Sequence, residues 1–243
     1  MSIYITGDTH GHIDVHKLAT KQWKEGAKLT KDDFLIILGD FGFIWNLDSM
    51  DDWWLNWLNE RPWTTLFIDG NHDNHPLIDT FPEVDFYGGR AHKINKSVYH
   101  LMRGYIFDLP YNDTTKSFAV MGGAESIDKA WRVEGVSWWP TEIPNDDERQ
   151  LLEKNLEARN WTVNYMLTHD APNSVIPKLG ILLKIENLHA NEFENWLGGI
   201  EYKLNFDKWY FGHWHTDYDL DPLHVVLYNY IEKLEDEPCQ TNT

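Results

Sequence analysis

The chain has 243 residues, and 39 acidic against 21 basic side chains give it a net charge of −18. This length suits one large α/β domain, and 42% hydrophobic residues can form a substantial core. An acidic surface repels long polyanions, which argues against a long nucleic acid as partner. A bound metal pair would still attract a phosphate locally, so the charge does not exclude phosphoester substrates.

Two further features of the sequence indicate the cellular compartment of the protein. Cys239 is the single cysteine, so the chain cannot form an internal disulfide, which fits a reducing compartment. The first residues contain neither a basic segment nor an apolar stretch as long as that of a signal peptide. The apolar run 34–38 is far too short to span a bilayer. We therefore expect a cytoplasmic protein with no membrane partner. Residues 1–232 are expected to form the domain, and 233–243 an acidic, mobile tail.

In chain order, five β-rich apolar runs each end at a polar turn that mostly contains glycine. They predict strands over 2–6, 33–38, 64–68, 163–167 and 208–211. Alternating patterns predict an antiparallel pair of strands over 98–109 and 116–121, and a third such strand over 224–230.

Helical patterns lie between these runs. They predict helices over 12–24, 49–60, 145–159 and 192–197, the last closed by Gly198 and Gly199. The helix over 145–159 has Asn145 as a plausible N-cap, and acidic residues in its first turn are favourable. The helix over 49–60 is expected to turn Trp53, Trp54, Trp57 and Leu58 inward.

The polar turns carry the chemistry. Ligands of α/β sheets bind beyond the carboxyl ends of the strands, so motifs at five strand ends are expected to converge. The motifs are Asp8-Thr9-His10, Gly39-Asp40, Gly70-Asn71-His72-Asp73, Thr168-His169-Asp170 and Gly212-His213-Trp214-His215. Each alone also reads as an ordinary turn or a structural histidine. The ordered set favours a metal site, because carboxylate and imidazole donors suit Mn, Fe, Zn or Ni.

The donors in these motifs are Asp8, His10, Asp40, Asn71, His169, His213 and His215. A site for two metal ions needs one ligand that both ions share. Asp40 is the best candidate, because its two carboxylate oxygens can each bind one ion.

This ordered set resembles the calcineurin-like metallophosphoesterase superfamily. The resemblance implies an α/β fold of the metallo-dependent phosphatase type: a four-layer α-β-β-α sandwich of two mixed β-sheets flanked by helices. It also implies two divalent metal ions, with Mn as the first choice and Fe, Zn or Ni as alternatives. One ion would take Asp8, His10, Asp40 and His215, and the other Asp40, Asn71, His169 and His213.

The resemblance further implies in-line attack on phosphorus by a hydroxide that bridges the metals. His72 would protonate the leaving group or stabilise charge on the phosphoryl group. The phosphoprotein-phosphatase branch carries a second Asp, which orients this histidine, where Phe43 stands here, and an Arg that this chain lacks. The partner of His72 therefore stays open among Asp73, Asp69 and Asp170, with Asp73 assigned to the catalytic pair.

A phosphate usually needs a cation besides the metals. Arg132 and Arg90 are the candidates for substrate binding. The main hypothesis is a phosphatase that acts on a small phosphoester, a nucleotide or a phosphopeptide. One alternative is a phosphodiesterase for cyclic nucleotides or dinucleotides. Another is a catalytically silent, metal-bound scaffold protein.

Overall fold

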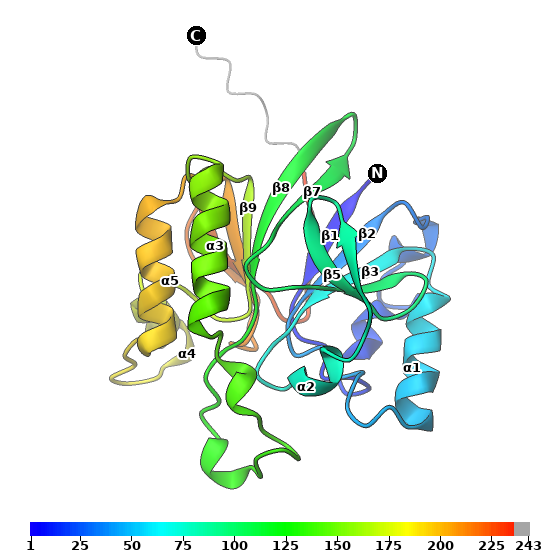
Figure 1. Cartoon of the computed structure of the whole chain (residues 1–243), viewed down its shortest axis with the longest axis horizontal. Helices are drawn as coiled ribbons and strands as arrows, with labels where there is room; N and C mark the ends of the chain where they lie inside the picture. Colours follow the sequence, from blue (N-terminus) through cyan, green and yellow to red (C-terminus); the bar gives the residue numbers. More distant parts are fainter. Residues whose placement is uncertain (236–243) are drawn as a thin grey trace.

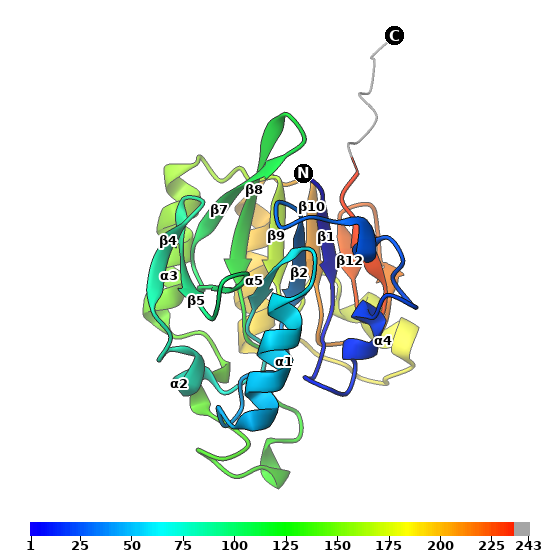
Figure 2. The ribbon, with the colours of Figure 1, turned by 90° about the vertical axis from the view of Figure 1, so that its right-hand side faces the viewer.

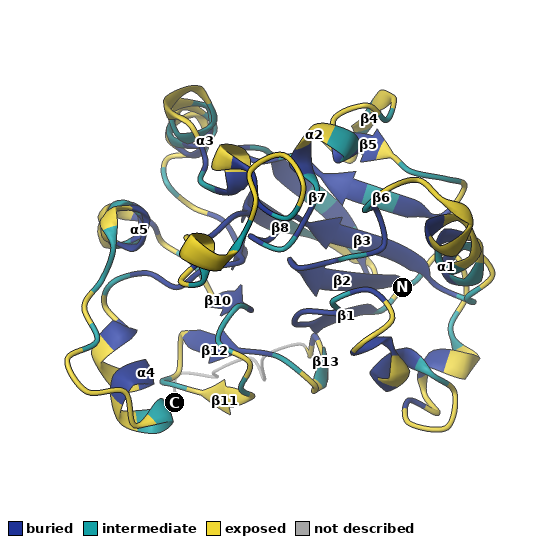
Figure 3. Cartoon of the chain, turned by 90° about the horizontal axis from the view of Figure 1, so that it is seen from below, coloured by how far each residue is buried: buried dark blue, intermediate teal, exposed yellow. Residues whose placement is uncertain are grey.

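Two β-sheets lie face to face between outer layers of helices in the computed structural model, which describes residues 1–235. Figure 3 shows the four layers end-on, with α1 outside one sheet and α3, α4 and α5 outside the other. The predicted four-layer fold with two mixed sheets is thus confirmed.

The first sheet has seven strands in the order β13-β1-β2-β3-β6-β5-β4. The parallel core consists of β1, β2, β3 and β6, and the other three strands are antiparallel to their neighbours. The strands are β1 (Ile3–Thr6), β2 (Phe34–Leu38), β3 (Thr64–Ile68), β4 (Glu83–Phe86), β5 (Gly89–Lys93), β6 (Val98–Leu101) and β13 (Ile231–Lys233).

The second sheet has six strands in the order β11-β12-β10-β9-β8-β7. Its strands β8, β9, β10 and β12 run parallel, and β7 and β11 are antiparallel at the edges. The strands are β7 (Ile106–Tyr111), β8 (Thr114–Met121), β9 (Tyr165–Thr168), β10 (Lys208–Phe211), β11 (Tyr218–Asp219) and β12 (His224–Val226).

The helices cover the outer faces, and Figure 2 shows α1 in front of the first sheet. They are α1 (Ser49–Asn59), α2 (His75–Ile78), α3 (Asp146–Ala158), α4 (Ile176–Leu183) and α5 (Glu192–Lys203), with 3₁₀ turns at Val15–Leu18, Gly26–Lys28, Lys129–Trp131 and Pro140–Glu142. The side chain of Asn145 caps α3 in a capping box with Glu148.

The strands of the parallel core are apolar throughout because both faces of each sheet are covered. In β2, Ile36 and Leu38 face the core between the sheets, whereas Leu35 and Ile37 face the layer of α1. Burial of both faces fixes the register of these strands, and with it the position of the turn that follows each one.

Residues 12–24 do not form the expected helix. They contain turns and one short 3₁₀ segment, Val15–Leu18. The side chain of Asp14 contacts His10, and the buried ammonium of Lys17 donates to the backbone carbonyls of Gly7, Asp8 and Tyr228. These tertiary contacts fix the segment in a form that an isolated amphipathic helix would not have.

Other expected boundaries are also wrong. The segment 98–109 is two strands in different sheets, because Gly104 has a φ of +82° and turns the chain between them. The strand β12 ends at Val226 rather than at residue 230, and it pairs antiparallel with β11 on one side and parallel with β10 on the other. Gly198 and Gly199 do not close a helix but lie within α5.

The structure also differs from the sequence-based expectations at Trp53, at one further helix and at the C-terminal end. Trp53 is 56% exposed and lies outside the inner face of α1, whereas Leu58 is fully buried. The helix α4 was not predicted from the sequence. Lys233 belongs to β13 and Leu234 is buried, so the expected tail does not begin at Lys233; its residues 236–243 lie outside the described part.

Within residues 1–235, no helix combines the length and the apolar character needed to cross a membrane.

Candidate metal centre

The carboxyl ends of strands from both sheets meet at one edge of the sandwich. There, β1 leads to Asp8, β2 to Asp40 and β3 to Asn71, while β9 and β10 of the second sheet lead to His169 and His213. The fold therefore brings the five motifs together at this edge, as expected from the sequence.

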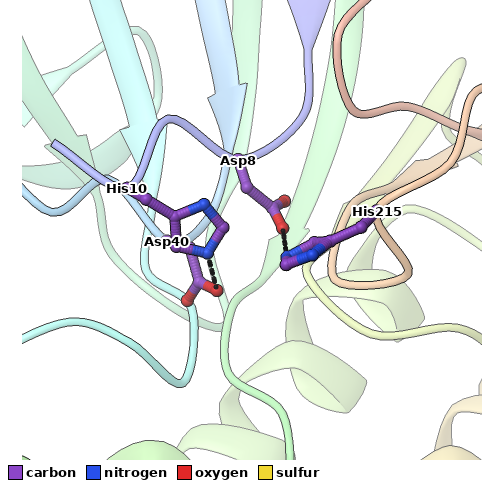
Figure 4. Close-up of side chains that lie close together, drawn as sticks. All are labelled: Asp8, His10, Asp40 and His215. Atoms are coloured by element: carbon purple, nitrogen blue, oxygen red, sulfur yellow. Dashed lines mark ion pairs between the residues drawn. The ribbon is translucent and has the colours of Figure 1, made fainter. Parts of the chain in front are cut away.

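Four of the predicted ligands form a compact group (Figure 4). One donor atom from each of Asp8, His10, Asp40 and His215 lies within 4.8 Å of the donor atoms of the others. Nε2 of His10 lies 3.2 Å from Oδ2 of Asp40, and Nε2 of His215 lies 3.2 Å from Oδ2 of Asp8. This is the set that the resemblance implies for one ion.

The other three predicted ligands, Asn71, His169 and His213, form a second set together with Asp40. Nε2 of His169 lies 3.4 Å from Oδ1 of Asp40 and 3.1 Å from Oδ1 of Asn71. The rings of His213 and His169 lie edge to face, with centroids 5.1 Å apart. The two oxygens of Asp40 therefore face the two sets separately.

The backbone at these ligands is held in an uncommon conformation. His10, Asp40, His213 and His215 have φ angles of +42°, +45°, +65° and +46°. Each such residue costs on the order of 1–3 kcal/mol and persists only where the surrounding structure imposes it. Here the conformation occurs at four of the seven predicted ligands, in both sets of donors.

Glycines give the ligands their space. A Cβ atom at Gly39 would lie 2.2 Å from Nδ1 of His169, one at Gly70 2.2 Å from Oδ1 of Asp40, and one at Gly212 2.3 Å from Oδ1 of Asp8. All three distances are far below any real contact of a Cβ atom. The glycines that precede the ligands are therefore required by the packing of the donor groups themselves.

The donor set fits divalent metal ions. Donors that bind one ion at about 2.0–2.2 Å lie about 3.0–3.4 Å from one another, which matches the 3.2 Å pairs above. Oδ2 of Asp8 and Oδ2 of Asp40 are buried and accept no hydrogen bond from the described residues. Buried carboxylate oxygens without a donor are costly, and a cation would satisfy them.

The protonation of the histidines supports the same fit. Burial disfavours charged His10, but the carboxylates of Asp40, Asp8 and Asp14 outweigh burial and raise its pKa to about 9. Burial also opposes charge on His169, yet Asp40 and Asp8 raise its pKa to about 10. Without metal, protons on these imidazoles balance the two carboxylates, and a divalent ion would replace those protons.

Neighbouring groups orient the imidazoles. Nδ1 of His10 lies 2.8 Å from Oδ2 of Asp14, and Nδ1 of His169 lies 2.7 Å from the carbonyl of Leu38. In each ring Nδ1 donates to an acceptor, which directs Nε2 to the centre. The role of Asp14 was not predicted from the sequence, although its spacing of four residues from His10 was a usable signal.

A family model for calcineurin-like phosphoesterases matches residues 1–217. The chain belongs to this family. The protein is accordingly a metal-dependent phosphoester hydrolase, and the Asp/His cluster is its candidate site for divalent metal ions. A comparison with curated proteins gives no match.

His72 lies beside the metal ligands of this phosphoesterase. Its backbone N–H donates to Oδ1 of Asp40 over 2.7 Å, and its ring lies edge-on to that of His10, with centroids 5.7 Å apart. Nη2 of Arg132 lies against both ring nitrogens of His72, 2.9 Å from Nε2. Burial and the charges of Arg132 and His10 outweigh Asp40 and lower the pKa of His72.

Arg132 reaches the centre from the segment between β8 and α3, which extends beyond the strand ends in Figure 1. Oδ1 of Asp128 accepts from its Nε over 2.7 Å, and the carbonyl of Ser137 accepts from Nη1 over 3.0 Å. These two anchors direct Nη2 to His72. The role of Asp128 was missed, although its position four residues before Arg132 pointed to a pair.

The three carboxylates considered as partners of His72 bind elsewhere. Asp73 accepts hydrogen bonds from the amides of Phe41, Gly42 and Gly70, so it holds the backbone around Asp40. Asp69 binds His100 and Arg103, and Oδ1 of Asp170 accepts from the amide of Ala171. The ring nitrogens of His72 lie against Arg132 instead.

Arg90 lies on β5, in the edge hairpin of the first sheet. Its guanidinium pairs with Oδ1 of Asp85 at 2.8 Å and with Oε2 of Glu83 at 3.0 Å. These carboxylates, rather than a phosphate, are its partners. The structure therefore gives the predicted substrate contact of Arg90 no support.

Proposed function

We propose that this phosphoesterase is a two-metal phosphatase for small phosphoesters, with a small phosphomonoester, a nucleotide or a phosphopeptide as substrate. The observation that carries the proposal is the placement of Asp40. Its Oδ2 lies 3.2 Å from His10 in one set of donors, and its Oδ1 lies 3.4 Å from His169 in the other. A buried carboxylate between two donor sets is what a pair of ions needs as a shared ligand.

The proposed ligands are Asp8, His10, Asp40 and His215 for one ion, and Asp40, Asn71, His169 and His213 for the other. Mn is the first choice, and Fe, Zn and Ni fit the same mixture of carboxylate and imidazole donors. Two such ions would activate water and neutralise charge on the phosphate.

His72 is the proposed catalytic residue at the leaving group. Its lowered pKa keeps the ring neutral at pH 7, so the ring can donate one hydrogen bond to the phosphoryl or leaving oxygen. A bound phosphate would raise this pKa again, because its negative charge favours the imidazolium that can transfer a proton. Asp73 acts indirectly, by holding the loop that carries Asp40.

Arg132 is the proposed phosphate contact. Its side chain is 12% exposed, and hydrogen bonds to Asp128 and to the carbonyl of Ser137 fix the plane of the guanidinium beside His72. A guanidinium held in this way can bind two phosphate oxygens at once, which a lysine ammonium cannot do.

Two wider proposals concern the surroundings of the protein. The net charge of −18 supports small substrates rather than a long nucleic acid. A single cysteine among 243 residues supports a cytoplasmic location.

The test is hydrolysis of p-nitrophenyl phosphate and bis-p-nitrophenyl phosphate by metal-stripped protein, titrated separately with Mn²⁺, Zn²⁺, Ni²⁺ and Mg²⁺. Metal-dependent turnover that favours the monoester supports the phosphatase. Turnover that favours the diester would replace it with a phosphodiesterase for cyclic nucleotides or dinucleotides. Bound ions with no turnover of either ester would favour a narrow substrate range or the silent scaffold protein.

A further inference from the structure

Asn71, at the end of β3, is linked to a buried pair on another segment. Nδ2 of Asn71 lies 3.0 Å from Oγ of Ser126, and Oγ of Ser126 lies 2.5 Å from Oε2 of Glu142. Ser126 and Glu142 belong to the segment between β8 and α3, and both are at most 4% exposed. This chain of hydrogen bonds joins that segment to a proposed metal ligand.

The direction of each hydrogen bond follows from the groups involved. A carboxylate only accepts, so Glu142 takes the hydroxyl proton of Ser126 at Oε2 and the amide proton of Ser126 at Oε1, the latter over 3.1 Å. Oγ of Ser126 has then used its one proton and can only accept from Asn71. The amide nitrogen of Asn71 therefore faces Ser126, and Oδ1 faces His169 over 3.1 Å.

We infer that Glu142 and Ser126 are positioning residues that fix the amide of Asn71 with its oxygen towards the second metal ion. The two ends of an amide have nearly the same shape, so packing alone does not choose between them. Only the oxygen can bind a metal ion. The inference rests on the proposed two-metal site, and it assigns a purpose to two buried polar residues outside the ligand set.

Glu142→Gln offers a sharp test because it keeps the shape of the side chain but changes its polarity. The amide oxygen of the new glutamine side chain would accept from the N–H of Ser126, and its NH₂ group would then donate to Oγ. The proton of Ser126 would then have no acceptor unless Oγ gave it to Asn71, which favours the amide with its oxygen turned away from the metal. Ser126→Ala instead removes the group that holds the amide.

The measurement is Mn²⁺ bound per chain at graded free Mn²⁺, by equilibrium dialysis and metal analysis. In both variants we expect the first ion to bind with unchanged affinity and the second about 10–100-fold more weakly, the range for partners of metal ligands. Ser126→Thr, which keeps the hydroxyl, should restore the second affinity. Thr141→Ala is the matched control, since Thr141 precedes Glu142 and is exposed.

The outcomes separate the positioning role from the two-metal site on which it rests. Wild-type protein that binds two ions, with both affinities unchanged in Glu142→Gln and Ser126→Ala, would overturn the positioning role alone. Wild-type protein that binds a single ion at saturation would overturn the two-metal proposal and this inference together. Should Ser126→Ala fail to fold, the affinity for the second ion is compared between Glu142→Gln, Ser126→Thr and the wild type.

Discussion

Gly70→Ala adds one methyl group directly behind the proposed shared ligand. Gly70 does not have a positive φ angle, so alanine causes no backbone strain of its own, and the effect is steric. The new Cβ atom would lie 2.2 Å from Oδ1 of Asp40, 2.3 Å from the backbone nitrogen of Asp40 and 2.8 Å from Nε2 of His169.

The magnitude follows from these distances. An ordinary contact of a Cβ atom begins at 3.4 Å, so the backbone of Asp40 and Gly70 must separate by about 1.1 Å. Overpacking of this kind costs about 1–3 kcal/mol of the free energy of unfolding. A displacement of about 1 Å in a ligand shared by two ions should reduce turnover by on the order of 10²-fold and weaken both ions.

The assay combines Mn²⁺ binding, denaturant unfolding of the metal-free protein and turnover of p-nitrophenyl phosphate. Gly199→Ala is the control, because a Cβ atom at Gly199 in α5 meets nothing within 4 Å. That variant should be up to about 1 kcal/mol more stable, from helix propensity, with unchanged metal binding. If Gly70→Ala bound Mn²⁺ like the wild type, the close packing around Asp40 would not position the metals.

Four further predictions concern the centre. His72→Ala should keep its metal content and lose about 10²–10⁴-fold in turnover, and unchanged turnover would remove His72 from the mechanism. Arg132→Ala should raise KM for the phosphomonoester, and an unaltered KM would return Arg132 to a structural role. At pH 7 His10 and His169, with pKa values of about 9 and 10, are protonated without metal, so calorimetry in buffers of different ionisation enthalpy should show release of about two protons on Mn²⁺ binding. Because these folded-state pKa values exceed 6.5, their contribution to the stability of the metal-free protein is complete below pH 6.5 and should be lost as the pH rises through 9–10 in denaturant titrations.

The strands that carry the ligands could be predicted from the sequence because they are buried on both faces. A continuous apolar run such as Phe34–Leu38, followed by Gly39-Asp40, shows both the strand and its end. Glycine next to a carboxylate or imidazole also indicated where side chains must approach the backbone closely. The structure gives the reason, since a Cβ atom at Gly39 or Gly212 would overlap a donor group.

The rest depends on contacts between distant segments. The helical pattern of 12–24 is overridden because Lys17 donates to the carbonyl of Tyr228, more than two hundred residues away in sequence. The contact between Arg132 and His72, like that between Ser126 and Asn71, depends on how the segment after β8 folds back over the strand ends. Local periodicity contains no information about these pairs, whereas Asp14 and Asp128 were within reach of a four-residue spacing rule.

The most direct test of the two-metal site is anomalous diffraction from crystals of the protein grown with Mn²⁺. We expect two anomalous peaks about 3.5–4 Å apart, one on each side of the carboxylate of Asp40. One should lie beside Asp8, His10 and His215, and the other beside Asn71, His169 and His213. A single peak at full Mn²⁺ saturation, or two peaks that Asp40 does not bridge, would contradict the two-metal site.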